Sequence, residues 1–279
     1  MATIITLTTD FGLTGAYVAA MKGVILGINP EAKLVDICHT IKPQSISQAA
    51  FVLSTVYQFF PEGTIHVVVV DPGVGTERKA IILRTPAACF IAPDNGVLSY
   101  VIQDFYQPHS LQTTPAEQPQ KIELRAGLEA VAITKPRFWR SPVSTTFHGR
   151  DIFAPVAARL SLGLSPKEFG EIINSLIALP LPHPYQEADG SIVGHILYID
   201  SFGNLITNIK SDDLPQVRKK AITVEVGNRL ISGLSRTYAE GNGLLTIIGS
   251  SGYLEISLKE GSACAFLGAE VGDEVRVRQ

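Results

Sequence analysis

The segment 64–70 constrains the fold more than any other feature of the sequence. It reads Thr-Ile-His-Val-Val-Val-Val, and every residue except the histidine is β-branched, which favours a strand. Its hydrophobicity is continuous rather than alternating, which is typical of a strand buried on both faces of a parallel sheet. Asp71-Pro72-Gly73 ends the run, so we expect a loop to follow a central, fully buried strand.

Strand and helix patterns alternate on both sides of this segment. Further strands are predicted from short β-branched or apolar runs at 3–8, 33–37, 80–84 and 89–92. Helices are predicted from apolar residues at helical spacing at 16–28, 45–60, 151–162 and 167–177. The alternation predicts an α/β N-terminal domain with a central, mostly parallel sheet.

The composition changes at 179–184, which reads Leu-Pro-Leu-Pro-His-Pro. Residues before proline favour extended backbone, so this segment is typical of a linker. Short strands parted by turns follow, and they are predicted at 194–199, 205–209, 221–226, 244–248, 253–258 and 274–277. We therefore expect an α/β catalytic domain at 1–178, a Pro-rich linker at 179–190 and a small all-β, barrel-like domain at 191–279.

Composition excludes several classes of protein. The formal charge is −3 over 279 residues and the sequence has no concentrated excess of Lys and Arg, which argues against a nucleic-acid partner. Cys38, Cys89 and Cys264 are scattered and form no CxxC pair, which favours a reducing compartment. No secretion signal or membrane-spanning run is apparent, and the histidines lack metal-ligand spacing. We expect a cytoplasmic enzyme or binding protein with no membrane partner, no metal and no cofactor.

Two aspartates follow predicted strands at the edge where α/β sheets bind ligands. Asp10 follows the first strand and Asp71 follows the central one. Arg78 shares the turn of Asp71, and His148 lies just before a predicted helix. Each has an ordinary structural interpretation: the aspartates as helix caps or turn formers, Asp71 and Arg78 as a surface ion pair, and His148 as a structural histidine. Brought together, Asp71, Arg78 and His148 would form a triad able to hold and polarise a water molecule.

Two short motifs resemble known nucleotide-binding signatures but do not match them. The glycines at 73 and 75 fit neither GxGxxG nor the P-loop, so a nicotinamide-dependent oxidoreductase is not indicated. Asp-Phe-Gly at 10–12 lacks the other elements of a protein kinase.

Two segments of the C-terminal half, 200–204 and 249–255, combine small and polar residues with one aromatic ring. The pattern alone is that of hairpin turns. It also suits a heteroaromatic ligand, because Phe202 or Tyr253 can stack on a base while the amide of Asn204 both donates and accepts hydrogen bonds.

Six segments together resemble the S-adenosylmethionine hydroxide adenosyltransferases, the relatives of the fluorinase and chlorinase. They occur in the order expected for that family and span most of the chain: Thr-Thr-Asp-Phe-Gly at 8–12, Val-Asp-Pro-Gly-Val-Gly-Thr at 70–76, Ala-Pro-Asp-Asn-Gly at 92–96, Thr-Phe-His-Gly-Arg-Asp-Ile-Phe-Ala-Pro at 146–155, Ile-Asp-Ser-Phe-Gly-Asn-Leu at 199–205 and Ser-Gly-Tyr-Leu-Glu-Ile at 251–256.

The resemblance implies a homotrimer whose substrate lies between the N-terminal domain of one subunit and the C-terminal domain of its neighbour. It implies that Asp71, Arg78 and His148 activate water and that Asp10 grips both ribose hydroxyls. It further implies a set of substrate-binding residues: Asn204 at adenine, Asp200, Ser250 and Ser251 at the methionine end, Phe147 and Phe202 lining the pocket, and Phe11, Asn95, Tyr253 and Glu255 from the same motifs.

The negative charge of Asp71 favours the hydrolase branch of this family over the halogenating branch. Halogenating relatives carry tyrosine at the position of Asp71, threonine at Val74 and serine at Gly149, and a carboxylate beside the reacting carbon repels a halide but accepts a hydrogen bond from water. The expected reaction is hydrolysis of S-adenosylmethionine at ribose C5′, giving adenosine and methionine. A halide-using relative and a non-catalytic adenosine- or S-adenosylmethionine-binding module are the alternatives. Two departures bear on substrate binding: Gly15 replaces an acidic residue, and 108–126 is a long polar excursion with several prolines.

Overall fold

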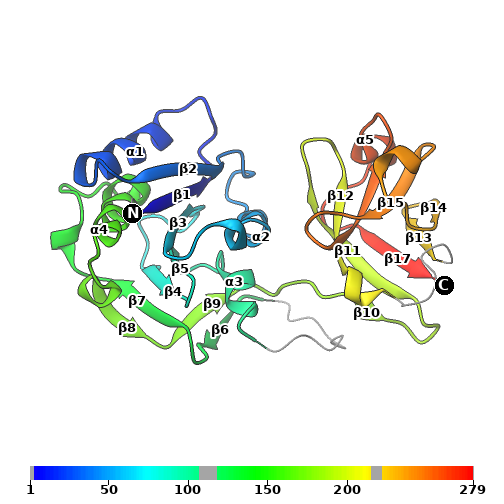
Figure 1. Ribbon diagram of the computed structural model, residues 1–279. Helices are drawn as coiled ribbons and strands as arrows, with labels where there is room; N and C mark the ends of the chain where they lie inside the picture. The colour runs from blue at the N-terminus through cyan, green and yellow to red at the C-terminus, as the bar shows by residue number, and fades with distance from the viewer. Residues whose placement is uncertain (1–2, 107–117, 215–221, 279) are drawn as a thin grey trace. The chain divides into compact units, whose positions relative to one another are not determined.

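The computed structural model of the protein describes residues 3–106, 118–214 and 222–278. The chain divides into two compact units between Pro180 and Leu181 (Figure 1). Residues 108–117 of the polar excursion and the first residue of the strand predicted at 221–226 lie outside the described residues. Each unit has its own hydrophobic core and is described separately.

The N-terminal unit is built on a seven-stranded sheet in the order β2-β1-β3-β5-β4-β7-β8. Its strands are β1 (Ile4–Thr9), β2 (Lys33–Cys38), β3 (Thr64–Val69), β4 (Ala80–Arg84), β5 (Ala88–Pro93), β7 (Glu129–Ile133) and β8 (Gly170–Ile173). β2, β1, β3, β5 and β7 run in one direction, and β4 and β8 run in the other. The prediction of a mostly parallel sheet is confirmed, and β3 lies inside it with every residue buried.

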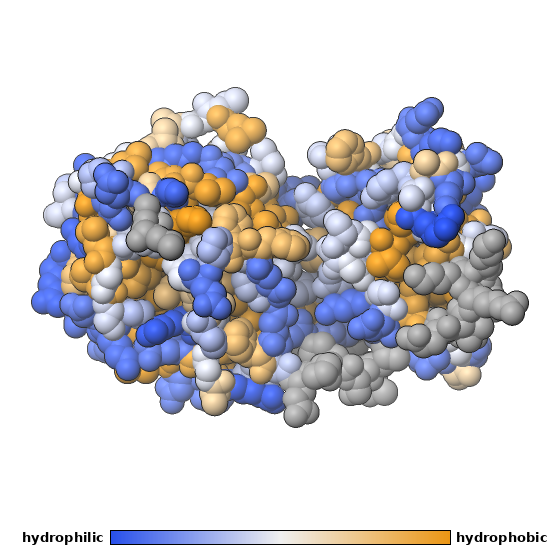
Figure 2. All heavy atoms as spheres, in the orientation of Figure 1, coloured by the Kyte–Doolittle hydropathy of each residue, from blue (hydrophilic) through white to orange (hydrophobic). Residues whose placement is uncertain are grey.

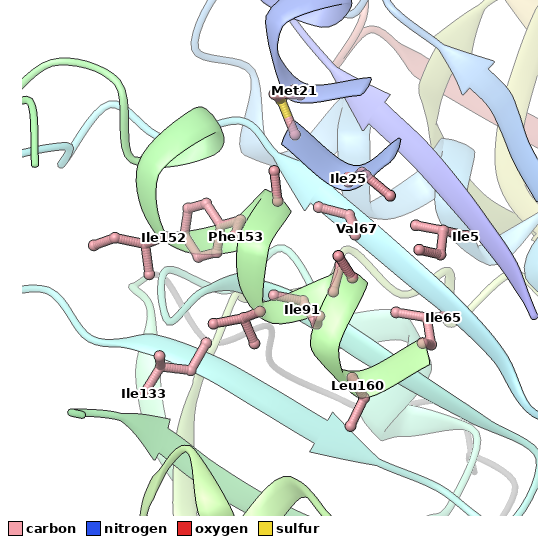
Figure 3. Close-up of a cluster of buried hydrophobic side chains, with 14 of the residues drawn as sticks. Ile5, Met21, Ile25, Ile65, Val67, Ile91, Ile133, Ile152, Phe153 and Leu160 are labelled. Atoms are coloured by element: carbon pink, nitrogen blue, oxygen red, sulfur yellow. The ribbon is translucent and has the colours of Figure 1, made fainter. Parts of the chain in front are cut away.

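Helices cover both faces of this sheet. α1 (Tyr17–Ile28) and α4 (Ala154–Ser161) pack on one face, where Met21 and Ile25 of α1 join a cluster that includes Val67 (Figure 3). α2 (Ile46–Ser54) and α3 (Ser99–Gln103) cover the opposite face.

Alternate residues along β3 and Val70, which follows it, point into the two clusters. Ile65, Val67 and Val69 lie with α1 and α4, whereas Val68 and Val70 lie with α2 and α3. Side chains of a strand alternate between faces, so a strand covered on both sides must be apolar throughout. This explains the continuous hydrophobicity of the segment.

The helix predicted at 167–177 is wrong. A short 3₁₀ turn, Pro166–Glu168, leads into β8 and then into β9 (Ser175–Ala178), which pairs with β6 (Gln120–Glu123). A Cβ on Gly170 would lie 1.7 Å from the carbonyl oxygen of Ala132, so β8 packs directly against the backbone of β7. Sheet pairing at this edge overrides the local helical spacing of the apolar residues.

Two predicted helices have different bounds in the structure. The helix predicted at 45–60 ends at Ser54 and is followed by a 3₁₀ turn, Tyr57–Phe59. The helix predicted at 151–162 begins as a π-helical turn, Gly149–Phe153, that continues into α4.

The C-terminal unit is an antiparallel, nearly closed barrel-like sheet in the order β14-β13-β17-β11-β12-β16-β15. Its strands are β10 (Tyr185–Gln186), β11 (Ile192–Ile199), β12 (Leu205–Lys210), β13 (Thr223–Val226), β14 (Arg229–Ser232), β15 (Leu244–Ile248), β16 (Tyr253–Leu258) and β17 (Glu274–Arg278). The amide of Ser235, just after β14, donates to the carbonyl of Thr246 in β15 (2.8 Å), which links the two ends of the sheet. The barrel-like prediction is confirmed, although β14 and the helix α5 (Ala263–Leu267) were not predicted.

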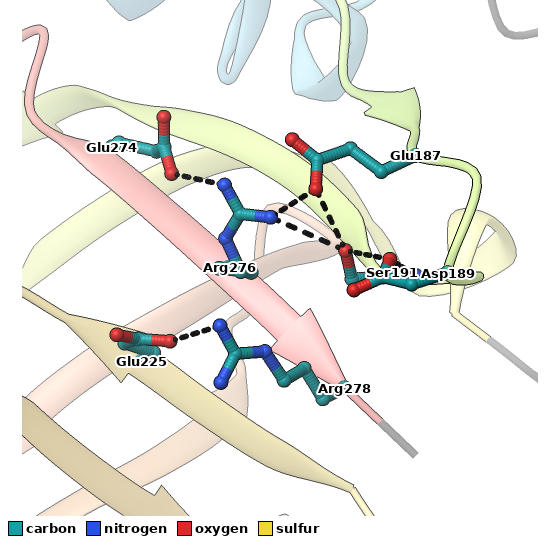
Figure 4. A network of polar contacts seen from close by, with 7 residues as sticks. All are labelled: Glu187, Asp189, Ser191, Glu225, Glu274, Arg276 and Arg278. Atoms are coloured by element: carbon teal, nitrogen blue, oxygen red, sulfur yellow. Dashed lines mark hydrogen bonds and ion pairs between the residues drawn. The ribbon is translucent and has the colours of Figure 1, made fainter.

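A polar network anchors the segment around Glu187, which leads into the barrel, to the strand β17. Arg276 of β17 lies between Glu187 and Glu274 and contacts Ser191, and Arg278 pairs with Glu225 (Figure 4). Glu187 falls in the segment predicted as linker, so the end of that segment is anchored to the barrel. In both units apolar residues also reach the visible surface among polar ones (Figure 2). Among the described residues, no helix has the length and apolarity needed to cross a membrane.

Candidate functional site

Asp71 and Arg78 form a bidentate ion pair in the loop that follows β3. Arg78 Nε donates to Asp71 Oδ1 (2.8 Å), and Arg78 Nη2 donates to Asp71 Oδ2. Only 4% of the Asp71 side chain and 10% of the Arg78 side chain are exposed. The guanidinium also lies 5.4 Å from the ring centroid of Phe153. Such a pair is geometrically fixed by its two parallel hydrogen bonds, unlike an ordinary surface ion pair.

Gly75 allows this loop to pack closely against the segment that precedes His148. Gly75 has a φ of +78°, and a Cβ there would lie 2.5 Å from the carbonyl oxygen of Thr145. Only glycine allows both the left-handed backbone and this close approach. The Asp71–Arg78 loop therefore packs directly on the segment that leads to His148.

His148 completes the triad through Arg78. Its Nδ1 lies 3.0 Å from Arg78 Nη2. Because a guanidinium only donates hydrogen bonds, Nδ1 must accept, which leaves the proton of the neutral ring on Nε2. Burial and the charge of Arg78 lower the pKa of His148 below its ordinary value, although Asp71 and Asp151 oppose the shift. The imidazole is therefore neutral at pH 7, with Nε2–H as a donor.

A π-helical turn and a buried carboxylate position His148. The residue immediately precedes the turn Gly149–Phe153, and such turns are frequent at functional sites. Asp151 in this turn is fully buried and accepts hydrogen bonds from the amide of Ser144 (2.9 Å) and from the side chain of Arg150 (2.7 and 2.8 Å). Asp151 thus joins the two ends of the segment 144–151, which contains His148. Sequence reasoning missed this role, although the residue stands only three positions after the histidine.

Asp10 lies at the same edge of the sheet as Asp71. Thr9 and Val69 are paired in the neighbouring strands β1 and β3, and Asp10 and Asp71 follow one and two residues later. The Oδ2 atom of Asp10 accepts a hydrogen bond from the amide of Gln44 (2.8 Å). The topology therefore brings together the two carboxylates that the sequence placed at strand ends.

Three aromatic rings pack together: Phe11, which follows Asp10, Phe147, which precedes His148, and Tyr17. The ring centroid of Phe147 lies 5.7 Å from that of Phe11 and 5.1 Å from that of Tyr17. Phe11 and Phe147 were predicted as site residues, and Tyr17 was missed. A tyrosine at the first position of a helix gives no signal in the sequence pattern.

The side chain of Asn95 is engaged by the backbone. Its Nδ2 donates to the carbonyl of Val70 (2.9 Å) and its Oδ1 accepts from the amide of Val97 (3.2 Å). It holds the residue immediately before Asp71. Its predicted contact with substrate stays a prediction.

In the C-terminal unit, Asp200 organises a tight loop. Its Oδ1 accepts from the amides of Phe202 and Asn204, and its Oδ2 accepts from Asn204 Nδ2, each at 2.9 Å. Gly203 has a φ of +82° and packs against Ser262. The loop leaves Phe202 76% exposed while Asn204 is buried. An exposed ring on a rigid turn is suited to stacking on a flat ligand.

The remaining predicted residues lie on or beside the turn between β15 and β16. Ser250 and Ser251 are exposed at its tip. Tyr253 lies under Lys210, with 5.7 Å between the ammonium and the ring centroid. Glu255 is buried and accepts from Tyr238 Oη and Ser257 Oγ, both at 2.8 Å. Within residues 3–106, 118–214 and 222–278, no group of three or more His, Cys, Asp or Glu side chains is arranged to hold a metal ion.

Comparison with known proteins places these residues in context. Residues 5–170 match the SAM hydroxide adenosyltransferase N-terminal domain, and residues 194–276 match its C-terminal domain. A protein of Salinispora arenicola named (R)-S-adenosyl-L-methionine hydrolase is 34% identical over 279 residues, covering 98% of this chain and 97% of that protein. A fluorinase of Nocardia brasiliensis is 26% identical over 309 residues, covering 99% and 96%.

Solved structures agree with the sequence comparison. The crystal structure of an uncharacterized conserved protein from Thermotoga maritima superposes with a TM-score of 0.84 at 34% identity, covering 99% of this chain and 100% of that one. Both domain models and relatives of nearly full length thus match a chain that carries the Asp71–Arg78–His148 arrangement. The chain belongs to the SAM hydroxide adenosyltransferase family.

Proposed function

We propose that this protein hydrolyses S-adenosyl-L-methionine at ribose C5′, giving adenosine and L-methionine. The single observation that carries the proposal is the position of Arg78, which donates hydrogen bonds to both Asp71 and His148. Full-length relatives named (R)-S-adenosyl-L-methionine hydrolase, 32–34% identical to this chain, support the same reaction. Their names also support the R epimer at sulfur as the substrate.

Arg78 leaves complementary hydrogen-bonding groups on its two partners. Each oxygen of Asp71 retains a lone pair that can accept a hydrogen bond from water. His148 presents Nε2–H, which can donate to the oxygen of that water. A water held in this way has its lone pair oriented and its proton directed toward a carboxylate. Positioning of this kind can contribute roughly 7–11 kcal/mol to lowering a barrier.

The reaction balances without a further reactant. The water oxygen forms a bond to C5′ while the C5′–sulfur bond breaks, and the bonding pair leaves with sulfur as the neutral thioether of methionine. The proton released by water passes to Asp71 and then to solvent. Because the leaving group starts as a sulfonium cation, no acid is needed to protonate it.

The charge of Asp71 favours water over a halide. The carboxylate is nearly buried, so its negative charge is poorly screened and repels an anionic nucleophile. Arg78 offsets that charge, but its guanidinium hydrogens facing Asp71 and His148 are already used. The loop therefore offers a desolvated halide little stabilisation.

The remaining assignments follow from the family resemblance. Asp10 would grip the ribose hydroxyls and Asn204 the adenine, with Asp200, Ser250 and Ser251 at the methionine end. The rings of Phe11, Phe147, Phe202 and Tyr253 and the polar groups of Asn95 and Glu255 would complete substrate binding. We further propose a metal-independent, cofactor-free homotrimer that acts in the cytoplasm, whose oligomeric state sedimentation would test.

The proposal is tested by incubating the purified protein with each sulfonium epimer after dialysis against EDTA. We expect adenosine and methionine in equal amounts, faster from the R epimer, at a rate unchanged by EDTA. Tight adenosine binding in calorimetry with no turnover of either epimer would instead support a binding module. Halogenated adenosine formed in chloride or fluoride would support a halide-using enzyme.

A further inference from the structure

A buried histidine outside the triad lies behind the loop that carries Asp10. His39 follows β2 and is 5% exposed. Its Nδ1 lies 2.9 Å from Oγ1 of Thr9, the fully buried last residue of β1. Its Nε2 lies 2.9 Å from Oδ1 of Asp36, whose other oxygen pairs with Lys22 of α1. These four residues connect α1, β2 and the end of β1.

The contact between His39 Nε2 and Asp36 Oδ1 has the distance of an ion pair but not the geometry of a hydrogen bond. Contacts with Lys22 and His39 lower the pKa of Asp36 despite burial, which keeps it ionised. The Thr9 hydroxyl connects His39 to the turn that carries Asp10, because its oxygen also accepts a hydrogen bond from the amide of Phe11 (3.2 Å).

The same segment holds the Asp10 turn through its backbone. The amide of Gly12 donates to the carbonyl of His39 (2.7 Å). The amide of Gln44 donates to Asp10 Oδ2, and Gln44 has a φ of +65°, which is costly for a residue with a side chain. Strained residues persist where the surrounding structure requires them, so the segment 39–44 is built to hold Asp10.

We propose that His39 and Thr9 are positioning residues that set the orientation of the Asp10 carboxylate toward the ribose diol of the substrate. This inference rests on the proposed function, in which Asp10 binds both hydroxyls. In this proposal neither His39 nor Thr9 contacts the substrate. They act by fixing the amides of Phe11 and Gly12 and hence the turn that carries Asp10.

The chain offers a matched control. Thr6 and His66 form a second buried pair in the same sheet, with 2.8 Å between Oγ1 and Nδ1, and both residues are fully buried. Thr6 lies in the middle of β1, away from the Asp10 turn. Thr9→Val and Thr6→Val therefore remove the same hydroxyl from the same kind of contact. Thr9→Ser keeps the hydroxyl and serves as the rescue.

The experiment measures the affinities for adenosine and 2′-deoxyadenosine by calorimetry in the wild type and these variants. We expect Thr9→Val to weaken adenosine binding roughly tenfold, the loss of about one hydrogen bond to a charged group, with 2′-deoxyadenosine much less affected. Thr6→Val should change neither affinity, and Thr9→Ser should restore most of the loss. His39→Gln provides a second variant if Thr9→Val does not fold.

Hydrogen exchange separates this inference from the proposed function. We expect faster exchange of the Phe11 and Gly12 amides in Thr9→Val than in Thr6→Val. Equal affinities and equal exchange in the two valine variants would overturn the positioning role while leaving the hydrolase proposal intact. If wild-type protein bound no adenosine and hydrolysed neither epimer, the proposed function would fail and the role at the ribose would fail with it.

Discussion

Substitution of Gly75 by alanine should disable the triad without touching any of its side chains. The added Cβ would lie 2.5 Å from the carbonyl oxygen of Thr145, so the loop must move away from the segment before His148. Arg78 lies three residues later in that loop and contacts His148 at 3.0 Å. A displacement of about 1 Å is enough to separate these two side chains, and misplacement on that scale can cost roughly 100-fold in rate.

The effect of Gly75→Ala on stability can be separated from its effect on activity. A non-glycine residue in the left-handed region costs about 1–2 kcal/mol. Gly63 provides the control, because it has a φ of +82° and a Cβ added there would meet no described atom within 4 Å beyond its chain neighbours. Gly63→Ala should therefore lose this stability alone. Gly75→Ala should lose at least as much stability and, in addition, about 100-fold in kcat.

The assay is urea denaturation for stability and adenosine release for turnover, on both variants at one temperature. If Gly75→Ala kept a kcat within about threefold of Gly63→Ala, the close approach of the two loops would not control catalysis. The assignment of Arg78 and His148 to one functional unit would then be wrong.

Three further predictions concern charge. Asp71→Asn should lower kcat at least about 100-fold and destabilise the fold by roughly 3–5 kcal/mol, because it leaves Arg78 buried without its partner. The rate should fall in acid with an apparent pKa below 6.5, since burial and then Arg78 lower the pKa of His148 and a protonated ring cannot accept from Arg78. Burial lowers the pKa of His66 to about 4, so the free energy of unfolding should fall by about 2 kcal/mol from pH 7 to pH 5.

Each of these has its own control. The double variant Asp71→Asn with Arg78→Met should regain stability but not activity, and a recovery of activity would exclude the ion pair from catalysis. A rate still constant well below the range in which His148 is neutral would exclude its role as an acceptor. For His66 the sign is fixed because the unfolded chain binds the proton near pH 6.5 and the native chain does not. His66→Leu should flatten the stability profile between pH 7 and pH 5, and an unchanged slope would contradict the assignment.

The sequence predicted the N-terminal sheet well where local and global preferences agree. The run 64–70 became β3 because its residues are β-branched and suit burial on both faces. The segment 167–177 was misassigned because its apolar residues have helical spacing, whereas Gly170 and the open edge of β7 decide the outcome. Pairing with a strand about 40 residues earlier is a tertiary effect that no local pattern contains.

The triad was only partly visible in the sequence. Asp71 and Arg78 share one turn, so their contact follows from local spacing. His148 stands 70 residues further along than Arg78, and tertiary packing, such as that of Thr145 on Gly75, brings it near. The supporting residues Asp151, Tyr17 and His39 were missed because each acts through contacts made by the folded chain. Family motifs supplied candidates, and the fold supplied their arrangement.

The most direct test of the central claim is the position of oxygen after hydrolysis of S-adenosylmethionine in ¹⁸O-labelled water. Attack of water at C5′ predicts adenosine labelled at its 5′ oxygen, unlabelled methionine, and labelled adenosine formed at least about 100-fold more slowly by the Asp71→Asn variant. Label in the amino-acid product, or adenosine without label, would place the attack elsewhere and contradict the account.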